Sequence, residues 1–314
     1  MLQKIHVRGL LYGRRPDCSG ILRELWGLLA KHQPVVCPSS DAASLSIAPM
    51  KIATWNVNSV RSRLDHVTGW LQENPVDFLC LQETKVIDSD FPRSAFTDLG
   101  YHLEISGQKS YNGVAIASRQ PVDHCAIGFS AVLDAELVGD LDDQKRVIMV
   151  RSGDLVLVDL YVPNGSEIGN EKYAYKLRWL ALLKTYLTEL LTQHPQVCVC
   201  GDFNIAYEDR DIHNPKNRET HIMSSDEERA ALKTSVLDLG FQDAFRLFCD
   251  EGDRFSWWDY RSGGFQRNRG WRIDHLYLSP ALIPAARSCE IDIEPRKLEK
   301  PSDHTPVVLD LAID

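Results

Sequence analysis

The sequence lacks the short motifs that mark several large enzyme classes. It contains no GxGxxG or GxxxxGK[ST] loop of the kind that cradles nucleotide phosphates, and no HExxH or CxxC pair that would hold zinc. A GxSxG nucleophile elbow is also absent, because the nearest segment, NGSEIG, has a different spacing. These absences argue against dinucleotide-dependent enzymes, P-loop enzymes, zinc hydrolases and serine hydrolases.

Long apolar runs are missing as well. No window approaches the roughly 18 consecutive apolar residues that a membrane-spanning helix needs, so we expect a soluble protein. The eight cysteines are scattered, which argues against a disulfide framework and favours reduced thiols in the cytosol. With 314 residues, 44% hydrophobic and 25% charged, the composition is that of a globular enzyme with one large core or two smaller ones.

Most of the chain has no excess of positive charge. The formal net charge is −9, and residues 1–49 carry six basic against three acidic residues, a net +3 that leaves −12 on residues 50–314. An acidic body argues against a protein that coats nucleic acid without specificity. It is compatible with a nuclease, because metal-binding carboxylates contribute negative charge themselves.

Residues 1–49 show no sustained periodicity. We expect them to form a poorly ordered N-terminal extension ahead of a single catalytic domain over residues 50–314. Charged residues interrupt their one amphipathic piece, ILRELWGLLA, which argues against a signal peptide. Two alternatives stay open for this segment: an organellar targeting peptide, and translation from a start upstream of a true beginning at Met50.

From Met50 onward, short apolar runs alternate with stretches of helical periodicity. The segments that indicate strands are KIATWN, DFLCLQE, GVAIAS, RVIMVR, LVLVDLYVP, QVCVCGD, RIDHLYLS and VVLDLAI. The longest helix is expected over residues 173–194, with Tyr173, Leu177, Leu180, Leu187 and Leu191 on one side. This order predicts one layered α/β domain in which sheets pack together inside helices, with a doubly wound parallel sheet as the alternative.

Polar residues stand next to several of these strands. They are Asn56, Glu83, Tyr161, Asn164, Asp202, Asn204, Asp274, Asp303 and His304. In layered α/β folds the strand ends form one rim, so residues distant in sequence meet there. Taken singly, each has a simpler explanation as the cap of a turn or as a loop residue. The pair Asp202 and Asn204 is more informative, because residues two apart in an extended backbone point to the same face.

The chemistry of this set is rich in oxygen, with one imidazole. Carboxylate and amide oxygens suit Mg²⁺ or Mn²⁺, which commonly bind phosphates through one or two carboxylates and several waters. The set therefore predicts metal-assisted hydrolysis of a phosphodiester.

An aromatic stretch lies beside Asp274. Trp257, Trp258, Trp271 and Ile273 flank a loop that carries three arginines, Arg261, Arg267 and Arg269. Aromatic residues are most often core and arginines most often solvated. Their interleaving here favours a small apolar pocket edged by phosphate contacts.

Seven segments in order carry a family resemblance that runs from Met50 to the C-terminus. They are KIATWNVNSVRSRL, DFLCLQETKV, YNGVAI, LYVPNG, GDFNIA, FSWWDYRSGGFQRNRGWRIDHLYLS and PSDHTPV. With them the sequence resembles the exonuclease III family of abasic-site (AP) endonucleases, within the endonuclease/exonuclease/phosphatase superfamily. The resemblance implies a four-layer α/β sandwich with two central mixed β-sheets flanked by helices. Residues 1–49 are not part of it, and the segment YEDRDIHNPKN matches only approximately.

The resemblance implies a role for each polar residue. Glu83 is expected as the main metal ligand, Asp202 as the base that orients or deprotonates the attacking water, and His304 as a stabiliser of charge on phosphorus, oriented by Asp274. The expected catalytic residues are Tyr161, Asp202, Asn204, Asp274 and His304, and the expected ligands of Mg²⁺, or alternatively Mn²⁺, are Asn56, Glu83, Asp202, Asn204, Asp303 and His304.

The same resemblance implies the substrate contacts. Trp257, Trp271 and Ile273 correspond to a pocket for a flipped, baseless sugar, which costs less unstacking energy than a normal nucleotide. The other expected substrate contacts come from Arg61, Lys109, Asn164, Arg261, Arg267 and Arg269.

The function implied is hydrolysis of the phosphodiester 5′ to an abasic site in duplex DNA, with 3′→5′ exonuclease and 3′-phosphatase activity in addition. The expected partners are duplex DNA with abasic sites or blocked 3′ ends, and no membrane. We expect a monomer in the cytoplasm, near the nucleoid of a bacterial-type cell. Two alternatives are a phosphohydrolase of the same fold that acts on a phospholipid or inositol phosphate, and a catalytically inactive DNA-binding or scaffold protein.

Overall fold

Two six-stranded sheets form the centre of the computed structural model, which describes residues 50–313. The expectation of a poorly ordered extension over residues 1–49 lies outside the described residues. The first sheet has the order β11 (Ala286–Ile291), β12 (Val307–Leu311), β1 (Met50–Asn56), β2 (Phe78–Gln82), β4 (Val114–Ser118), β3 (His102–Ser106). The second has the order β5 (His124–Ile127), β6 (Val147–Ser152), β7 (Leu155–Tyr161), β8 (Gln196–Asp202), β10 (Asp274–Leu278), β9 (Gln242–Asp243). Both sheets are mixed, because β1 runs parallel to β2 and β7 runs parallel to β8 while the other pairs are antiparallel.

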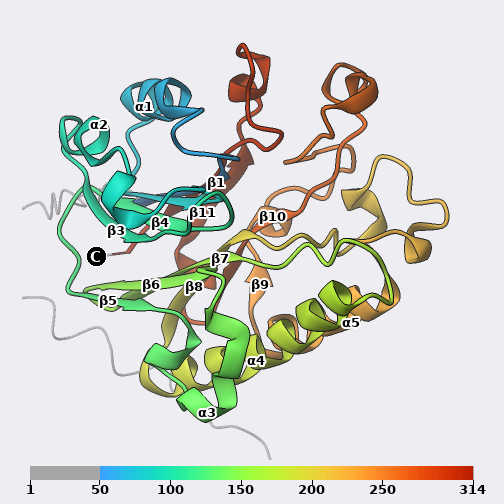
Figure 1. Cartoon of the computed structure of the whole chain (residues 1–314), viewed down its shortest axis with the longest axis horizontal. Coiled ribbons are helices and arrows are strands. Elements are labelled where there is room, and N and C mark those ends of the chain that lie inside the picture. The colour runs from blue at the N-terminus through green and yellow to red at the C-terminus, as the bar shows by residue number, and fades with distance from the viewer. Residues whose placement is uncertain (1–49, 314) are drawn as a thin grey trace, which may run out of the picture. The chain divides into compact units, whose positions relative to one another are not determined.

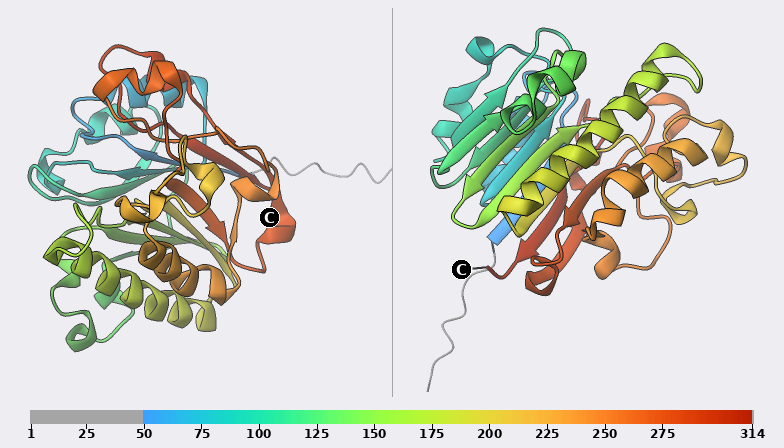
Figure 2. Two further views of the ribbon diagram at one scale, coloured as in Figure 1. Left: turned by 90° about the vertical axis from the view of Figure 1, so that its right-hand side faces the viewer. Right: turned by 90° about the horizontal axis from the view of Figure 1, so that it is seen from below.

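Helices cover the outer faces of the two sheets. The first sheet is covered by α1 (Leu64–Glu73) and α2 (Arg93–Thr97), and the second by α3 (Ala135–Val138), α4 (Glu171–Gln193) and α5 (Asp226–Ser235). Figures 1 and 2 show the resulting order of helices, sheet, sheet, helices. The predicted four-layer sandwich is thereby confirmed, and the doubly wound parallel sheet is wrong. None of the helices within residues 50–313 has the length and apolar character needed to cross a bilayer.

The strands are buried on both faces, which explains their nearly continuous apolar sequences. Along β7 every residue is buried: Val156, Val158 and Leu160 pack toward α4, whereas Leu155 and Leu157 pack toward the first sheet. This alternation of period two is repeated in β1, β2 and β8. Each of these strands therefore has one row of side chains that points into the space between the sheets.

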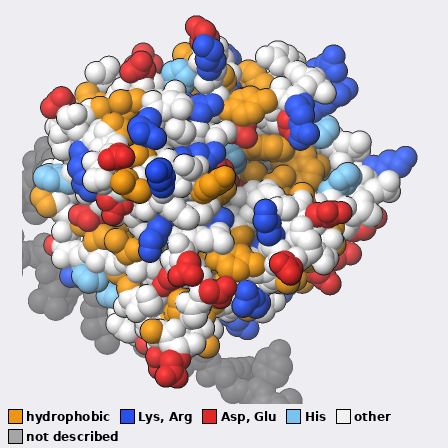
Figure 3. Space-filling model, viewed as in Figure 1, with side chains coloured by type: hydrophobic (Ala, Val, Ile, Leu, Met, Phe, Trp, Pro, Cys, Tyr) orange, Lys and Arg blue, Asp and Glu red, His pale blue; other side chains and the backbone are white. Residues whose placement is uncertain are grey.

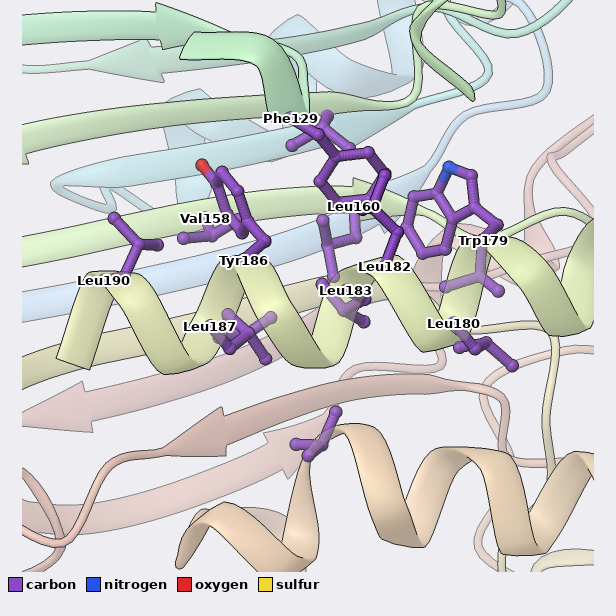
Figure 4. Packing of buried hydrophobic residues seen from close by; sticks show 14 of the residues in the cluster. Phe129, Val158, Leu160, Trp179, Leu180, Leu182, Leu183, Tyr186, Leu187 and Leu190 are labelled. Carbon is purple, nitrogen blue, oxygen red and sulfur yellow. The ribbon is translucent and has the colours of Figure 1, made fainter. Parts of the chain in front are cut away.

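Helix α4 is held on the second sheet by aromatic and aliphatic contacts (Figure 4). The ring of Phe129 contacts Trp179 and Tyr186 edge to face, with ring centroids 5.0 and 5.3 Å apart. At the N-terminus of α4 the Asn170 side chain accepts a hydrogen bond from the Tyr173 amide at 2.8 Å, a cap that contributes about 1 kcal/mol. Leu177 and Leu191, which were expected on the buried face of α4, are only half-buried. The fully buried residues of α4 include Lys176.

The strands that the sequence pattern missed lie at or near the edges of the sheets. β3 and β11 are outermost strands of the first sheet and β5 is outermost in the second, and each has partly exposed residues without clean alternation. An edge strand is covered incompletely, so its sequence carries a weak burial signal.

Candidate active site

The site lies where the inner rows of side chains reach the ends of the strands. The inner row of β1 ends at Asn56, that of β7 at Tyr161 and that of β8 at Asp202, while β10 begins at Asp274. Strand pairing places Asp202 beside both Tyr161 and Asp274. The expectation that these polar residues meet at one rim is therefore correct, with Asp274 at the start of its strand.

Three residues form what we call the acidic centre: Glu83, Asp202 and His304 each offer a ligand atom, and these atoms lie within 4.8 Å of one another. The Asn56 amide lies between the two carboxylates and donates to Glu83 Oε1 and to Asp202 Oδ2, both at 2.8 Å. In this arrangement Asn56 bridges the two carboxylates through its nitrogen.

Glu83 reaches the centre through an unusual backbone conformation. It follows β2 with a φ of +52°, and Lys85 two residues later has a φ of +55°. A left-handed conformation at residues other than glycine costs energy and is retained where surrounding contacts enforce it. Here Lys85 Nζ binds Glu83 Oε2 at 2.8 Å and the side-chain oxygen of Asn58 at 2.6 Å.

His304 is oriented by a buried carboxylate. Its Nδ1 lies 3.0 and 2.9 Å from the two oxygens of Asp274, and the Ser256 hydroxyl donates to Asp274 at 2.6 Å. The other ring nitrogen, Nε2, lies 3.8 Å from Asp202 Oδ2. A carboxylate on one nitrogen fixes the ring and leaves the second nitrogen turned toward the reaction centre.

Asn204 and Asn164 extend the site along the loops after β8 and β7. The Asn204 backbone amide donates to Asp202 Oδ1 at 2.9 Å, and its side-chain nitrogen donates to Val162 O at 3.0 Å and to Asp202 Oδ2 at 3.2 Å. The expected meeting of Asp202 and Asn204 occurs, but through a left-handed turn, because Asn204 has a φ of +51°. The Asn164 side chain in turn donates to Asn204 Oδ1 at 2.9 Å.

The charges of this group are strongly interdependent. Burial raises the pKa of Asp202 to about 7, against the lowering effect of His304 and with a further increase from Asp274. Burial alone would lower the pKa of His304, but Asp274 and Asp202 outweigh it and raise that pKa to about 10. Burial alone would raise the pKa of Glu83, yet Lys85 and the Asn56 hydrogen bond leave it below its ordinary value. At neutral pH the centre therefore holds a Glu83 carboxylate and a His304 imidazolium, with Asp202 near its midpoint.

This donor set fits a hard divalent cation. Two carboxylates converge, one of them with a raised pKa, and a cation between them would lower the pKa of both. Asp303 lies outside the acidic centre, since its two oxygens accept hydrogen bonds from Asn58 Nδ2 at 2.9 Å and Trp257 Nε1 at 3.0 Å.

Tyr161 closes the site on the side of the second sheet. Burial, together with Glu83, raises its pKa well above 10 and keeps the phenol neutral. The guanidinium of Arg146 lies over the ring, 4.5 Å from its centroid. A groove of about 590 Å³ continues from Tyr161 and Asn164 and is lined by Arg146, Lys172 and Arg178 among others.

An apolar wall stands on the other side. We give this name to Trp257, Trp271, Ile273 and Ile212, which pack in one cluster. Bridges of strand type join Ile212 to Trp271, Trp271 to Trp257, and Trp257 to His304. Figure 3 shows hydrophobic side chains gathered in a hollow at its upper right, with Lys and Arg side chains around it. The aromatic residues expected beside Asp274 therefore also lie next to His304.

The basic residues expected to contact the substrate are not part of the acidic centre or of the apolar wall. Arg61, Lys109, Arg267 and Arg269 are exposed, and their side chains form no hydrogen bond or ion pair within residues 50–313. Arg261 is exposed and pairs with Asp259.

A comparison with known proteins assigns the architecture. The model of the Endonuclease/Exonuclease/phosphatase family matches residues 53–304. The chain belongs to the endonuclease/exonuclease/phosphatase family. A relative in Haemophilus influenzae, exodeoxyribonuclease III, is 35% identical over 270 residues, which span 82% of this chain and 98% of that protein.

Two solved structures resemble this member of the endonuclease/exonuclease/phosphatase family. An AP endonuclease from Archaeoglobus fulgidus is 40% identical, with a TM-score of 0.77 over 84% of this chain and 100% of that one. A 3′ phosphatase from Neisseria bound to product DNA hairpin is 39% identical, with a TM-score of 0.79 over the same shares. The resemblance to exonuclease III-type AP endonucleases, and the assignment as a hydrolase of this kind, are thereby confirmed.

Sequence reasoning missed several residues of this family member's site. Asn58, Lys85 and Ser256 orient Asp303, Glu83 and Asp274, respectively. Asn58 could have been predicted from the sequence, because it is a second asparagine, two residues after Asn56 and just past the end of the same predicted strand. Ile212 of the apolar wall belongs to the segment YEDRDIHNPKN, whose spacing gave no structural expectation.

Proposed function

We propose that this chain is a divalent-cation-dependent DNA repair nuclease that hydrolyses the phosphodiester 5′ to an abasic site in duplex DNA and leaves a 3′-hydroxyl. The observation that carries the proposal is the position of the acidic centre beside the apolar wall, with Trp257 bridged directly to His304. A phosphodiester held at the centre would place the adjoining sugar against the wall. A sugar without a base fits such an apolar surface and costs less to unstack.

The residues of the centre divide the work between them. Asp202 accepts a proton from the attacking water, and the water oxygen bonds to phosphorus. The bond from phosphorus to the 3′ oxygen breaks, and the 3′ oxygen takes up a proton from solvent water. The His304 imidazolium stabilises negative charge on the phosphoryl oxygens from Nε2, and Asp274 keeps the ring in place. Glu83, with Asp202, would hold Mg²⁺ or Mn²⁺, which when bound supplies positive charge at the phosphoryl oxygens.

The amides and the phenol complete the contacts to the phosphate. We place Asn164 and Tyr161 on the phosphoryl group because both line the groove. We place Asn204 there with them because its Oδ1 accepts a hydrogen bond from Asn164. For Asn204, donation to phosphate requires the exchange of one existing bond, and the 3.2 Å bond to Asp202 is the longer. Asn56 then orients the Glu83 and Asp202 carboxylates by donating to both, and Asp303, held by Asn58 and Trp257, lies beside the centre.

DNA outside the reaction centre would contact basic side chains. We propose that Arg61, Lys109, Arg261, Arg267 and Arg269, which are exposed, meet backbone phosphates. The same centre would remove a 3′-phosphate or a 3′ nucleotide, since both reactions break a phosphoester at a 3′ oxygen. Residues 50–314 would form the single catalytic domain of a monomeric enzyme in the cytoplasm, near the nucleoid.

The test is cleavage of a duplex that contains one stable abasic analogue. Wild type, Asp202→Asn and Asp154→Asn are incubated with Mg²⁺ or with EDTA; Asp154 lies exposed before β7, at the end of the strand opposite Tyr161. We expect wild type and Asp154→Asn to cut 5′ to the analogue and leave an end that a polymerase extends, and we expect neither EDTA nor Asp202→Asn samples to do so. An intact duplex, cleavage in EDTA, or faster hydrolysis of an inositol phosphate offered in parallel would show the proposal to be wrong.

A further inference from the structure

The buried face of α4 contains one charged residue. Lys176 has no exposed surface, although its neighbours on this face include Tyr173, Trp179 and Leu180. Removing an ammonium group from water costs several kcal/mol unless charge and hydrogen bonds compensate it. The partner is Glu228 on α5, equally buried, whose Oε1 lies 2.6 Å from Lys176 Nζ.

The Lys176 ammonium also donates hydrogen bonds to two backbone carbonyls of the active site. Lys176 Nζ donates to the oxygen of Asn204 at 2.8 Å and to that of Asn164 at 3.2 Å. An ammonium has three hydrogens to donate, so these two bonds and the bond to Glu228 account for all of them. Asn164 and Asn204 are also the two residues whose side chains bind each other beside Asp202.

The backbone at these positions needs such support. Asn204 has a left-handed φ of +51°. Two hydrogen bonds hold this conformation: the backbone N–H of Asn204 donates to the Asp202 carboxylate, and the backbone carbonyl of Asn204 accepts from Lys176 Nζ. Gly165 follows Asn164 with a φ of +91°, and a Cβ there would lie 3.2 Å from Lys176 Cδ. The glycine thus leaves room for the lysine stem at the turn that Lys176 binds.

Glu228 is itself fixed from several directions. It accepts hydrogen bonds from the amide of Met223 at 3.1 Å and from the amide and hydroxyl of Ser225 at 3.0 and 2.8 Å. Ser225 caps α5, so the lysine is tethered to the start of that helix. The network joins α4, α5 and the loops after β7 and β8.

We propose that Lys176 is a positioning residue of the catalytic centre. By holding the carbonyls of Asn164 and Asn204 against Glu228, it fixes the paired amides of these residues and, through Asn204, the Asp202 carboxylate. The inference rests on the proposed function, because the amide pair and Asp202 act on the phosphodiester there. A pair with only a stabilising role could be replaced by uncharged residues of similar size without a loss of activity.

The test uses the double variant Lys176→Met/Glu228→Gln, which removes both charges and leaves neither one buried alone. Its control is Leu183→Ala, which opens a cavity two turns further along the buried face of α4 and touches neither carbonyl. On the abasic duplex, well below the unfolding temperature, we expect the double variant to lose about 10–100-fold in kcat. We expect its KM to stay within about twofold of wild type and Leu183→Ala to keep its kcat.

Backbone hydrogen exchange provides a readout that does not depend on the reaction. We expect amides of residues 161–165 and 202–206 to exchange about tenfold faster in the double variant than in either wild type or Leu183→Ala. Unchanged exchange in these segments overturns the inference whatever the enzyme acts on, and so does a double variant with wild-type kcat. If wild type fails to cut the abasic duplex but exchange rises as expected, the proposed function is wrong and the positioning of the two loops by Lys176 still holds.

Discussion

Asp202 and Asp274 are paired residues on the neighbouring antiparallel strands β8 and β10. Two carboxylates opposite each other repel when both are charged. His304 relieves the repulsion, since its Nδ1 binds Asp274 and its Nε2 lies 3.8 Å from Asp202. The strand register places both carboxylates next to His304, and both raise the pKa of its imidazole.

Replacing Asp274 with asparagine removes the largest influence that raises the His304 pKa. We expect kcat on the abasic duplex to fall by about 10²–10³-fold and the alkaline limb of the rate profile to move to lower pH. The measurement is kcat as a function of pH for Asp274→Asn, with Ser256→Ala as the control. That variant loses the 2.6 Å bond to Asp274 and the two 3.1 Å bonds that the hydroxyl accepts from the amides of Ile273 and Asp274, but it keeps the Asp274 carboxylate beside His304. An alkaline limb in the same place as in wild type contradicts the role of Asp274.

The acid limb of the wild-type profile should follow Asp202. Its pKa is raised to about 7, so the base is protonated below that pH and the rate rises as pH increases through it. A bound cation favours the carboxylate, so higher Mg²⁺ should move this limb to lower pH. The check is kcat/KM from about pH 5 to about pH 8 at two Mg²⁺ concentrations. An acid limb that does not move with Mg²⁺ argues against Asp202 as the titrating group.

Glu83→Gln should weaken cation binding with little effect on the cation-free fold. Ligands that bind only the folded state stabilise it, by about 2.7 kcal/mol at a concentration 100 times Kd. We expect Mg²⁺ to raise the Tm of wild type and of Glu189→Gln, an exposed change on α4, but not that of Glu83→Gln at the same concentration. Equal shifts in all three proteins would remove Glu83 from the ligand set.

Trp271→Ala should reduce selectivity for the abasic site more than folding stability. Aromatic contacts to nucleic acid contribute about 1–3 kcal/mol, so the ratio of abasic to intact cleavage should fall by roughly 5–150-fold. The control is Trp258→Phe, because Trp258 is buried against Phe265 at 5.1 Å and lies outside the apolar wall. Equal losses of selectivity in both variants would contradict a substrate role for Trp271.

The sequence identified the residues of the centre better than their supports. Asp202, Asp274 and His304 could be predicted because each stands beside a strongly apolar strand and belongs to a recognisable segment. Lys176 could not, since a lysine in a helix is normally solvated and its partner Glu228 lies 52 residues away. Pairings of this kind depend on the tertiary fold, which local periodicity does not encode.

The sequence also did not predict the backbone conformation at two residues of the site. The side chains of Asp202 and Asn204 were expected to meet because of an extended backbone, whereas a left-handed turn brings them together. Glu83 likewise reaches the centre through a positive φ. Residues distant in sequence contact both: Lys176 donates to the Asn204 carbonyl 28 residues away, and Asn56 donates to the Glu83 carboxylate 27 residues away.

β12 lies between β11 and β1, so the first sheet keeps a gap beside β1 until residues 307–311 have left the ribosome. His304 stands just ahead of that strand and takes its place only when the gap is filled. A chain that ends before residue 304 lacks the imidazole that binds Asp274. We therefore expect such truncated chains to be without nuclease activity, whatever part of the fold they form.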